Sequence, residues 1–297
     1  MDVGLTLGTR RRCMRLSEAT VAIVGLGLMG GSLAMALHGK CARLVGVVRT
    51  EETAQAALKA CVVDAVCSMG GAAPEADLVV LATPVRHIIA AIPTVAALMK
   101  PGAVLMDLGS TKADVVRAMD DIPPASGVAA VGGHPMCGKE VGGLENADAQ
   151  LFRGATFVLT PTLRTTQEGL ALAREVVAAV GAREVMLEPE QHDRAVAVIS
   201  HLPYLLASAL VQAEAQASER EPVTGRLASS GFRDTSRLAG SQTEMMLDIL
   251  LTNRKGIELA LDLFEEQLGR ARDLLDDPDG LKEWVIEAQK HRKGMFQ

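Results

Sequence analysis

Short apolar runs rich in β-branched residues alternate with amphipathic stretches through the first two thirds of the chain. A short apolar run bounded by turn residues is typical of a strand, and spacing near 3.6 is typical of a helix. Strands are expected at Thr20–Gly25, Arg43–Val48, Asp77–Ala82, Ala103–Asp107, Val128–Gly132, Ala155–Thr160 and Glu184–Leu187. Helices are expected at Leu28–Leu37, Glu51–Ala60, Val85–Leu98, Lys112–Met119 and Thr165–Val180. This alternation predicts a parallel, doubly wound sheet with helices on both faces.

The strand pattern ends near Glu188. Pro189–Ser218 then shows long helical periodicity without glycine, and only Pro203 is able to kink this helix. Further helices are expected through Trp284. The long helix is too apolar along its length for a single solvated face, which predicts packing against a second subunit. The expected organisation is an N-terminal extension, an α/β domain and an all-α dimerisation domain, at residues 1–17, 18–188 and 189–297.

Composition sets the class of protein. A chain of 297 residues with 48% hydrophobic and 22% charged residues is typical of a soluble globular protein large enough for two domains. Only 2% of the residues are aromatic, so the core must be aliphatic. The net charge of −6, without a long basic block, argues against nucleic acid as a partner.

The only dense basic cluster, Arg10-Arg11-Arg12, lies in the extension and is not followed by the apolar region of a secretory signal. No run approaches the roughly 18 uninterrupted apolar residues of a membrane span, so no membrane association is expected. The cysteines are odd in number and lack C-x-x-C spacing, which predicts reduced thiols in the cytoplasm and no metal site. They are Cys13, Cys41, Cys61, Cys67 and Cys137.

A glycine-rich turn, Gly25-Leu-Gly-Leu-Met-Gly30, lies between the first expected strand and the first expected helix. Gly25 permits a tight turn, Gly27 lets the backbone approach a pyrophosphate, and Gly30 allows close helix–strand packing. In this strand–turn–helix context the motif predicts a Rossmann-type dinucleotide site, with Leu28 and Met29 also at the cofactor.

The residue at the end of the second strand determines the preference between NAD and NADP, because an acid there binds a ribose hydroxyl and an arginine binds a 2′-phosphate. The run here is Val48-Arg49-Thr50, with no acid before Glu51. Arg49 and Thr50 are therefore predicted at the cofactor, with NADP preferred over NAD. A solvated Arg49 in an NAD enzyme is the alternative.

Two further strand ends carry polar residues where ligands of an open α/β sheet bind. Thr83-Pro84 ends one strand, and either a cofactor contact or a simple turn explains it. Ser110-Thr111 ends the next strand, and Asp114 lies three residues past Thr111 as in a capping box. A helix cap and a functional role are both open for this loop.

His134 follows the next apolar strand, within Val131-Gly-Gly-His-Pro-Met-Cys-Gly-Lys-Glu140. Glycine and proline there predict a sharp, non-repeating backbone that aims the side chain. A neutral imidazole, with an ordinary pKa near 6.5, suits the role of proton acceptor in alcohol oxidation. By itself, the stretch fits a tight turn with an incidental histidine better than a catalytic loop.

Together, several motifs resemble the prephenate/arogenate dehydrogenase family of tyrosine biosynthesis. They occur in the family's order, at Gly25–Gly31, Leu108–Lys112, Gly133–Gly138, Leu159–Pro161, Ile199-Ser-His-Leu-Pro203 and Gly231-Phe-Arg-Asp-Thr-Ser-Arg237. The resemblance implies a Rossmann domain with a helical domain that forms a homodimer. It also implies NAD(P)-dependent oxidative decarboxylation of prephenate to 4-hydroxyphenylpyruvate, or of arogenate to tyrosine.

By this resemblance His134 accepts a hydrogen bond from the substrate's ring hydroxyl, Ser110 orients it, and His201 lines the site near the nicotinamide. Arg237, helped by Arg233, holds a substrate carboxylate. The two arginines are i and i+4 on an expected short helix, where like charges cost roughly 0.2–0.5 kcal/mol unless an anion lies between them. Without the family pattern, two solvated arginines are the simpler interpretation.

Lys139 and Glu140 stand where substrate preference is decided. Lys139 offers a donor to a keto group, and Glu140 an acceptor for an ammonium group, so prephenate and arogenate both remain open. Met246 stands where some relatives carry an aromatic residue. Alternatives are a β-hydroxyacid dehydrogenase, for which Asn253-Arg-Lys255 is a poor match, and a non-catalytic dinucleotide sensor, which would not need His134.

Overall fold

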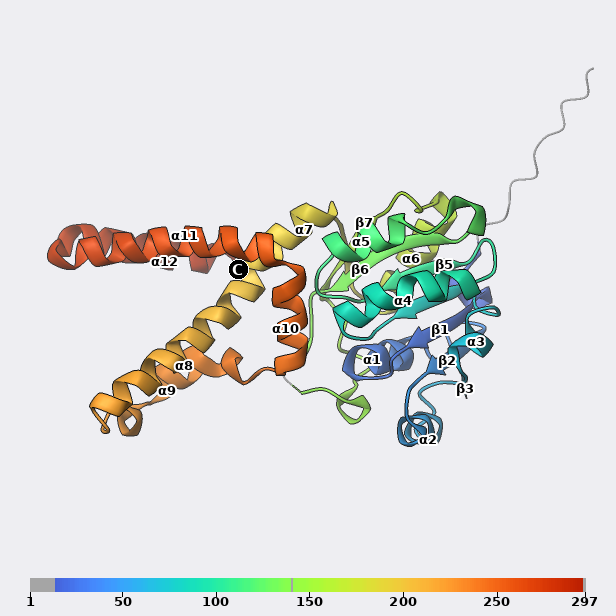
Figure 1. Ribbon diagram of the computed structural model, residues 1–297, viewed down its shortest axis with the longest axis horizontal. Helices are drawn as coiled ribbons and strands as arrows, with labels where there is room; N and C mark the ends of the chain where they lie inside the picture. The colour runs from blue at the N-terminus through green and yellow to red at the C-terminus, as the bar shows by residue number, and fades with distance from the viewer. Residues whose placement is uncertain (1–13, 140, 296–297) are drawn as a thin grey trace, which may run out of the picture.

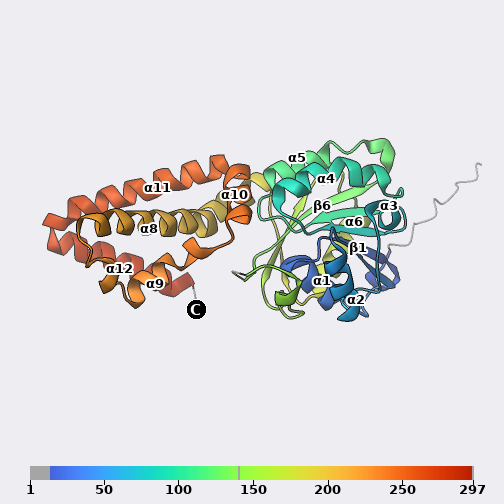
Figure 2. The ribbon, with the colours of Figure 1, turned by 60° about the horizontal axis from the view of Figure 1, so that its bottom comes forward.

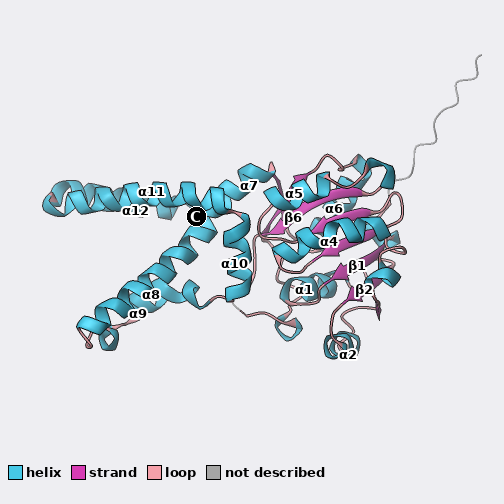
Figure 3. Ribbon diagram, in the orientation of Figure 1, coloured by secondary structure: helices cyan, strands magenta, loops and turns pink. Residues whose placement is uncertain are grey.

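The structure is a computed structural model that describes residues 14–139 and 141–295. The basic cluster Arg10–Arg12, Cys13 and Glu140 lie outside the described residues. Figure 1 shows a sheet domain formed by the first part of the chain and a lobe of helices that extends away from it. Figure 3 shows the same division by secondary structure, with all strands in the first domain.

Eight strands form one sheet in the order β3-β2-β1-β4-β5-β6-β7-β8. All neighbours are parallel except β6 and β7, which run antiparallel, so the expectation of a fully parallel sheet is wrong at this pair. The two strands β3 and β8 form the edges. The strands are β1 Thr20–Val24, β2 Arg43–Val47, β3 Ala65–Val66, β4 Leu78–Leu81, β5 Val104–Asp107, β6 Ala129–Pro135, β7 Thr156–Pro161 and β8 Arg183–Met186.

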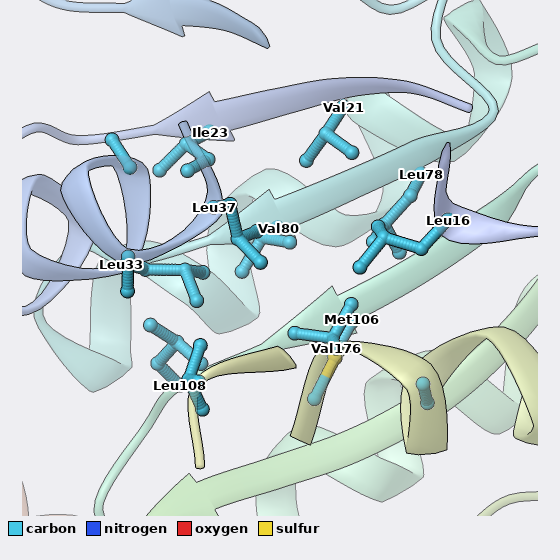
Figure 4. Close-up of a cluster of buried hydrophobic side chains, with 14 of the residues drawn as sticks. Leu16, Val21, Ile23, Leu33, Leu37, Leu78, Val80, Met106, Leu108 and Val176 are labelled. Carbon is cyan, nitrogen blue, oxygen red and sulfur yellow. The ribbon is translucent and has the colours of Figure 1, made fainter. Parts of the chain in front are cut away.

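Helices cover both faces of the sheet, because successive strand residues point to opposite sides. In β1, Val21 and Ile23 join one apolar cluster and Ala22 joins the other. Figure 4 shows the first cluster, where Leu33 and Leu37 from α1 lie beside strand residues. The helices are α1 Leu28–Leu37, α2 Glu51–Lys59, α3 Met69–Ala72, α4 Val85–Leu98, α5 Ala113–Asp120 and α6 Gln167–Ala179. Of these elements, only the short β3 and α3 were not expected.

The expected long helix exists, but a π turn, Ala197–His201, interrupts it. Pro203 has no N–H to donate to the Ile199 carbonyl, and a wider turn accommodates that missing bond. The helical lobe contains α7 Pro189–Val196, α8 Leu202–Arg220, α9 Ser230–Ser236, α10 Thr243–Thr252, α11 Arg254–Asp273 and α12 Pro278–Met295. Figure 2 shows α8, α11 and α12 in one elongated lobe, whereas α10 lies beside the sheet domain.

The helical lobe buries little of its own apolar surface. Only Ala197, Leu202, Ile257 and Ala260 form a buried cluster among its described residues. The helix Pro189–Arg220 is apolar and long enough to span a bilayer, yet only 28% of its most apolar window is buried. Leucines also lie exposed on its neighbours, at Leu251, Leu259, Leu263 and Leu268. No other described part of the chain covers this surface.

Candidate active site

His134 lies on a strand rather than in a sharp loop, which corrects the expectation from its glycine and proline neighbours. It is the penultimate residue of β6 and stands opposite Val158 of β7. The glycine at 133 is required by packing, because a Cβ there would lie 2.5 Å from the carbonyl oxygen of Asp107. Pairing with the antiparallel strand β7 holds the histidine at the end of the sheet.

A buried ion pair anchors the strand that carries His134. Lys112 and Asp107 are fully buried and their side chains pair with each other. The Asp107 carboxylate also accepts hydrogen bonds from the backbone N–H groups of Gly133, at 3.0 Å, and Gly109, at 2.7 Å. With both partners hydrogen-bonded, the pair ties the end of β5 to β6. Sequence analysis did not single out this pair.

His134 belongs to a chain of hydrogen bonds that begins in the helical lobe. Its Nδ1 lies 2.8 Å from Nε2 of His192, and Nδ1 of His192 lies 2.8 Å from a carboxylate oxygen of Asp193. A carboxylate only accepts, so His192 donates to Asp193 and its Nε2 accepts from His134. The proton of neutral His134 is therefore on Nδ1. Its Nε2 is left as an acceptor, with no hydrogen bond to any described residue.

Asp193 also caps α5, the helix that follows the Ser110-Thr111 loop. Its two oxygens accept from the backbone N–H groups of Lys112, at 2.7 Å, and Ala113, at 2.8 Å. Burial alone would raise the pKa of Asp193, but these bonds and the bond from His192 outweigh it and lower the pKa. The carboxylate therefore stays ionised, as the tautomer assignment requires.

The expected capping box at this helix is wrong. Asp114 instead pairs with Arg117 at 2.6 Å, and no side chain from the local loop caps α5. Thr111 instead meets Thr252 of α10, with 2.8 Å between the hydroxyl oxygens. A carboxylate 80 residues further along the chain caps α5 and joins the two domains.

His134 and His201 are held neutral by their surroundings. Burial lowers the pKa of His134 well below 6.5, and the nearby His192, Lys112 and His201 lower it further. Burial also lowers the pKa of His201 to about 4, although the Asp193 carboxylate acts in the opposite direction. A neutral His134 at physiological pH is able to accept a proton.

The π turn places His201 beside the same group of residues. An uninterrupted α-helix turns about 100° per residue, so nine residues would leave His192 and His201 on opposite faces. The wider turn removes roughly 100° of that rotation and brings the two rings to one side. Asn253 confirms the proximity, because its amide nitrogen contacts both the Asp193 carbonyl, at 2.6 Å, and Nδ1 of His201, at 3.1 Å.

A cavity of about 400 Å³ lies near this group along the chain: Ser200 lines it directly before His201, and Lys139 lines it shortly after His134, although neither histidine is among its lining residues. The predicted residues Arg237 and Lys139 line it from opposite domains, and Met246 lies in its wall. Lys139 also donates to the carbonyl of Asn146 at 3.0 Å. The one tyrosine of the chain, Tyr204, lines the cavity from α8. An aromatic ring is therefore present even though position 246 does not supply it.

Other predicted residues lie apart from this group. Arg233 is exposed, pairs with Asp234 at 3.6 Å and is not among the residues that line the cavity. Ser110 is half-buried and makes no hydrogen bond to His134 within the described residues, where His192 is the partner of the ring Nδ1. His192, and not Ser110, contacts the ring of His134 among the described residues, and the orienting role of Ser110 stays a prediction.

The glycine-rich turn has the geometry that dinucleotide binding needs. Gly25 has φ +90°, a Cβ at Gly30 would collide with the Gly25 carbonyl, and a Cβ at Gly27 would meet nothing within 4 Å. No side chain caps the α1 N-terminus, so its N–H groups remain available to a phosphate. The turn lies between β1 and β4, where strand order reverses and ligands of such sheets bind.

The remaining predicted cofactor residues surround this turn. The methyl group of Thr83 lies beside Gly25, and Pro84 precedes α4. Leu28 is buried and Met29 is half-buried against the core. Arg49 is exposed just past the end of β2. The next residue, Thr50, caps α2 by accepting a hydrogen bond from the backbone N–H of Thr53.

Four residues of this arrangement were missed from the sequence: Lys112, His192, Asp193 and Asn253. The adjacent pair His192-Asp193 in the first turns of a helix was a usable signal, because it lies close in sequence to His201. The other two residues gave no local signal. Within residues 14–139 and 141–295, no cluster of three or more His, Cys, Asp or Glu residues has metal-binding geometry.

The comparisons with known proteins cover both domains. Residues 33–186 match the model of the prephenate dehydrogenase nucleotide-binding domain, and residues 188–286 match that of the prephenate dehydrogenase dimerization domain. A prephenate dehydrogenase of Bacillus subtilis is 34% identical over 293 residues, which are 95% of this chain and 77% of the relative.

Two solved structures resemble the whole chain. Prephenate dehydrogenase from Aquifex aeolicus, in complex with hydroxyphenyl propionate and NAD+, has a TM-score of 0.87 and 30% identity over 96% of this chain and 100% of that one. Synechocystis arogenate dehydrogenase has a TM-score of 0.82 and 30% identity over 93% and 99% of the two chains. The chain therefore belongs to the prephenate dehydrogenase family.

Proposed function

We propose that this NAD(P)-dependent enzyme catalyses the oxidative decarboxylation of prephenate to 4-hydroxyphenylpyruvate, with His134 as the acceptor for the substrate hydroxyl. The observation that supports this role is the hydrogen-bond chain Asp193–His192–His134. It leaves the Nε2 of His134 as a lone-pair acceptor at the carboxyl edge of the sheet. Family membership supports the reaction.

In the proposed step, His134 Nε2 accepts the hydrogen bond of the ring hydroxyl and increases electron density at the carbon that bears it. The bound nicotinamide supplies the hydride acceptor. That carbon loses its hydrogen as hydride, the ring carboxylate leaves as CO2, and the released electron pair completes the aromatic ring. His192 and Asp193 stabilise the partial positive charge that develops on His134.

Charged side chains of the cavity bind the substrate's carboxylates in this proposal. Arg237 binds the side-chain carboxylate, and Lys139 approaches the neighbouring keto group. Ser110 and His201 contact the substrate ring region, while Arg233 acts at the margin of the site. Arogenate is the second candidate, because the Synechocystis relative is an arogenate dehydrogenase.

The α1 N-terminus and the turn formed by Gly25, Gly27 and Gly30 would hold the pyrophosphate of the dinucleotide. We propose a preference for NADP, because Arg49 is exposed at the strand end where a 2′-phosphate would lie. Arg49→Ala should lower kcat/KM with NADP by about 10–100-fold, as expected for hydrogen bonds to a charged group, and leave NAD nearly unaffected. An equal loss with both cofactors would contradict the assignment.

A homodimer completes the proposal. The exposed leucines of α11 and the apolar surface of α8 lie in the region that matches the dimerization domain. A second copy of the chain provides the cover that the helical lobe lacks.

The direct test is reduction of NAD or NADP, followed by absorbance at 340 nm, with prephenate and with arogenate as substrates. We expect turnover with prephenate to exceed turnover with arogenate. Faster turnover with arogenate would transfer the assignment to the second candidate, and absence of reduction with both substrates would end the proposal.

A further inference from the structure

Asn253 lies buried in the helical lobe and contacts two groups near the site. It is 5% exposed, at the junction of α10 and α11. Its amide nitrogen lies 2.6 Å from the Asp193 carbonyl oxygen and 3.1 Å from Nδ1 of His201. A backbone carbonyl can only accept, so the amide nitrogen, and not the amide oxygen, must face it. Each of the two amide hydrogens therefore has one partner.

The Asn253 amide determines where His201 carries its proton. Because Asn253 donates to Nδ1 of His201, that nitrogen must be the unprotonated one. The ring proton is then on Nε2, which has no hydrogen-bond partner among the described residues. This polarity is opposite to that of His134, whose proton is on Nδ1 and whose Nε2 is the free acceptor.

We propose that Asn253 is a positioning residue that fixes His201 as a neutral hydrogen-bond donor toward the substrate. Its Nε2–H would donate to an oxygen of the substrate, a carboxylate or carbonyl, while His134 accepts from the ring hydroxyl. The inference rests on the proposed function. It adds to that function a pair of histidines with opposite hydrogen-bond polarity, each set by a different partner.

Other groups near His201 bear on its protonation. Asp193 favours the charged ring, whereas burial and the nearby His192 disfavour it, and the balance keeps His201 neutral above about pH 4. His134 also couples to His201, and Lys112 opposes protonation of His134 in the same cluster. The neutral state thus follows from burial, and the choice between the two ring nitrogens follows from Asn253.

Two substitutions distinguish the effect of the hydrogen-bond donor of Asn253 from the effect of its side-chain shape. Asn253→Leu keeps a similar volume and removes the donor, so the ring proton of His201 should distribute over both nitrogens. Asn253→Asp replaces the donor with an acceptor, so the proton should move to Nδ1 and the pKa of His201 should rise. Both should lower kcat/KM by roughly 10–100-fold, as expected for loss of a supporting partner.

Thr252→Val is the matched control. Thr252 is the adjacent residue and joins the two domains through Thr111, and its hydroxyl bonds to Thr111 and to the carbonyl of Asp248 rather than to His201. It should keep both the kinetics and the histidine signals of the wild type. Its use distinguishes a general loosening of the domain contact from a change at His201.

The decisive measurement is 15N–1H NMR of the imidazole nitrogens in full-length, histidine-labelled protein, with His201→Gln to assign the signal. We expect the Nε2–H form of His201 in the wild type, and the Nδ1–H form in Asn253→Asp with an additional ionisation in its pH profile. An Nδ1–H form in the wild type, or unchanged tautomer and kcat/KM in Asn253→Leu, would overturn the proposal. The tautomer is measured without substrate, so it remains informative if no turnover is found with prephenate or arogenate.

Discussion

The sheet domain and the helical lobe differ in how they are stabilised. The sheet is covered on both faces and buries two extensive apolar clusters. The helical lobe buries a cluster of only four residues and leaves leucines exposed along α11. The first domain therefore has a core of its own, while the second needs a partner surface to reach comparable burial.

The two regions also contribute differently to the site. The sheet places His134 and the glycine-rich turn at its carboxyl edge by strand pairing alone. The helical lobe supplies the groups that determine the proton positions: His192, Asp193 and Asn253. The site therefore exists only where both regions meet, and the following predictions separate their contributions.

The largest effect is expected on the sheet side. His134→Asn removes the acceptor while leaving β6 and the nucleotide turn in place. It should lower kcat by roughly 10²–10⁴, the usual contribution of a positioned general base, without changing the dissociation constant for the cofactor. Steady-state kinetics and fluorescence titration with NADPH check both quantities. Turnover near that of the wild type would remove His134 from the mechanism.

On the helical side, Asp193→Asn should lower kcat by roughly 10–100-fold, because the partner that orients His192 is altered. It should also lower the free energy of unfolding by about 1.5–3 kcal/mol, because the amide has one acceptor oxygen for the two N–H groups of Lys112 and Ala113 and one bond to a charged acceptor is lost. Asp248→Asn is the matched control. The Asp248 carboxylate likewise accepts a hydrogen bond at a helix start, from the backbone N–H of Arg86 in α4, but it is not part of the hydrogen-bond chain of the histidines.

The control should lose stability to a similar extent and keep its kcat. Thermal denaturation and steady-state kinetics on both variants make the comparison. Equal losses of kcat in Asp193→Asn and Asp248→Asn would mean that domain contact, and not the hydrogen-bond chain, explains the effect.

A charge on the exposed face of the helical lobe tests its need for a partner. Leu263 is 58% exposed on α11. If a second copy covers it, Leu263→Lys should weaken the dimer by about 10–100-fold, because burying a leucine contributes roughly 1.5–3 kcal/mol. Leu163→Lys is the control, since Leu163 is 75% exposed on the sheet domain. Sedimentation velocity that shows the same dimer for both variants would exclude α11 from the interface.

The smallest effect is expected in the pH dependence of stability. His134 and His201 are neutral in the fold, with the pKa of His201 lowered to about 4, whereas an unfolded histidine has a pKa near 6.5. Between these values the unfolded chain binds protons that the fold excludes, so the free energy of unfolding should fall as pH decreases from 6.5 to 4. Urea denaturation checks the slope, which His201→Gln should reduce; an unchanged slope would contradict a buried neutral His201.

Much of the fold was accessible from local patterns. Strand and helix positions agree closely because apolar periodicity and turn residues act over a few positions, and the family assignment is confirmed by the matches to both domains. The antiparallel pairing of β6 and β7 was not predictable in this way. Strand direction depends on which segments meet in space, and the apolar runs of these two strands resemble those of the parallel ones.

The residues of the site also divide into those with a local sequence signal and those that depend on contacts distant in sequence. The spacing of the glycine-rich turn was sufficient to predict its strand–turn–helix geometry, whereas His134, His201 and Arg237 were named from the resemblance to the family, because each lies in one of its short motifs. The role of Asp193 as cap and hydrogen-bond partner, and that of Asn253 beside His201, required the tertiary structure. Both act across 52 to 81 positions of the chain, and a hydrogen bond at that separation leaves no periodic trace in the sequence.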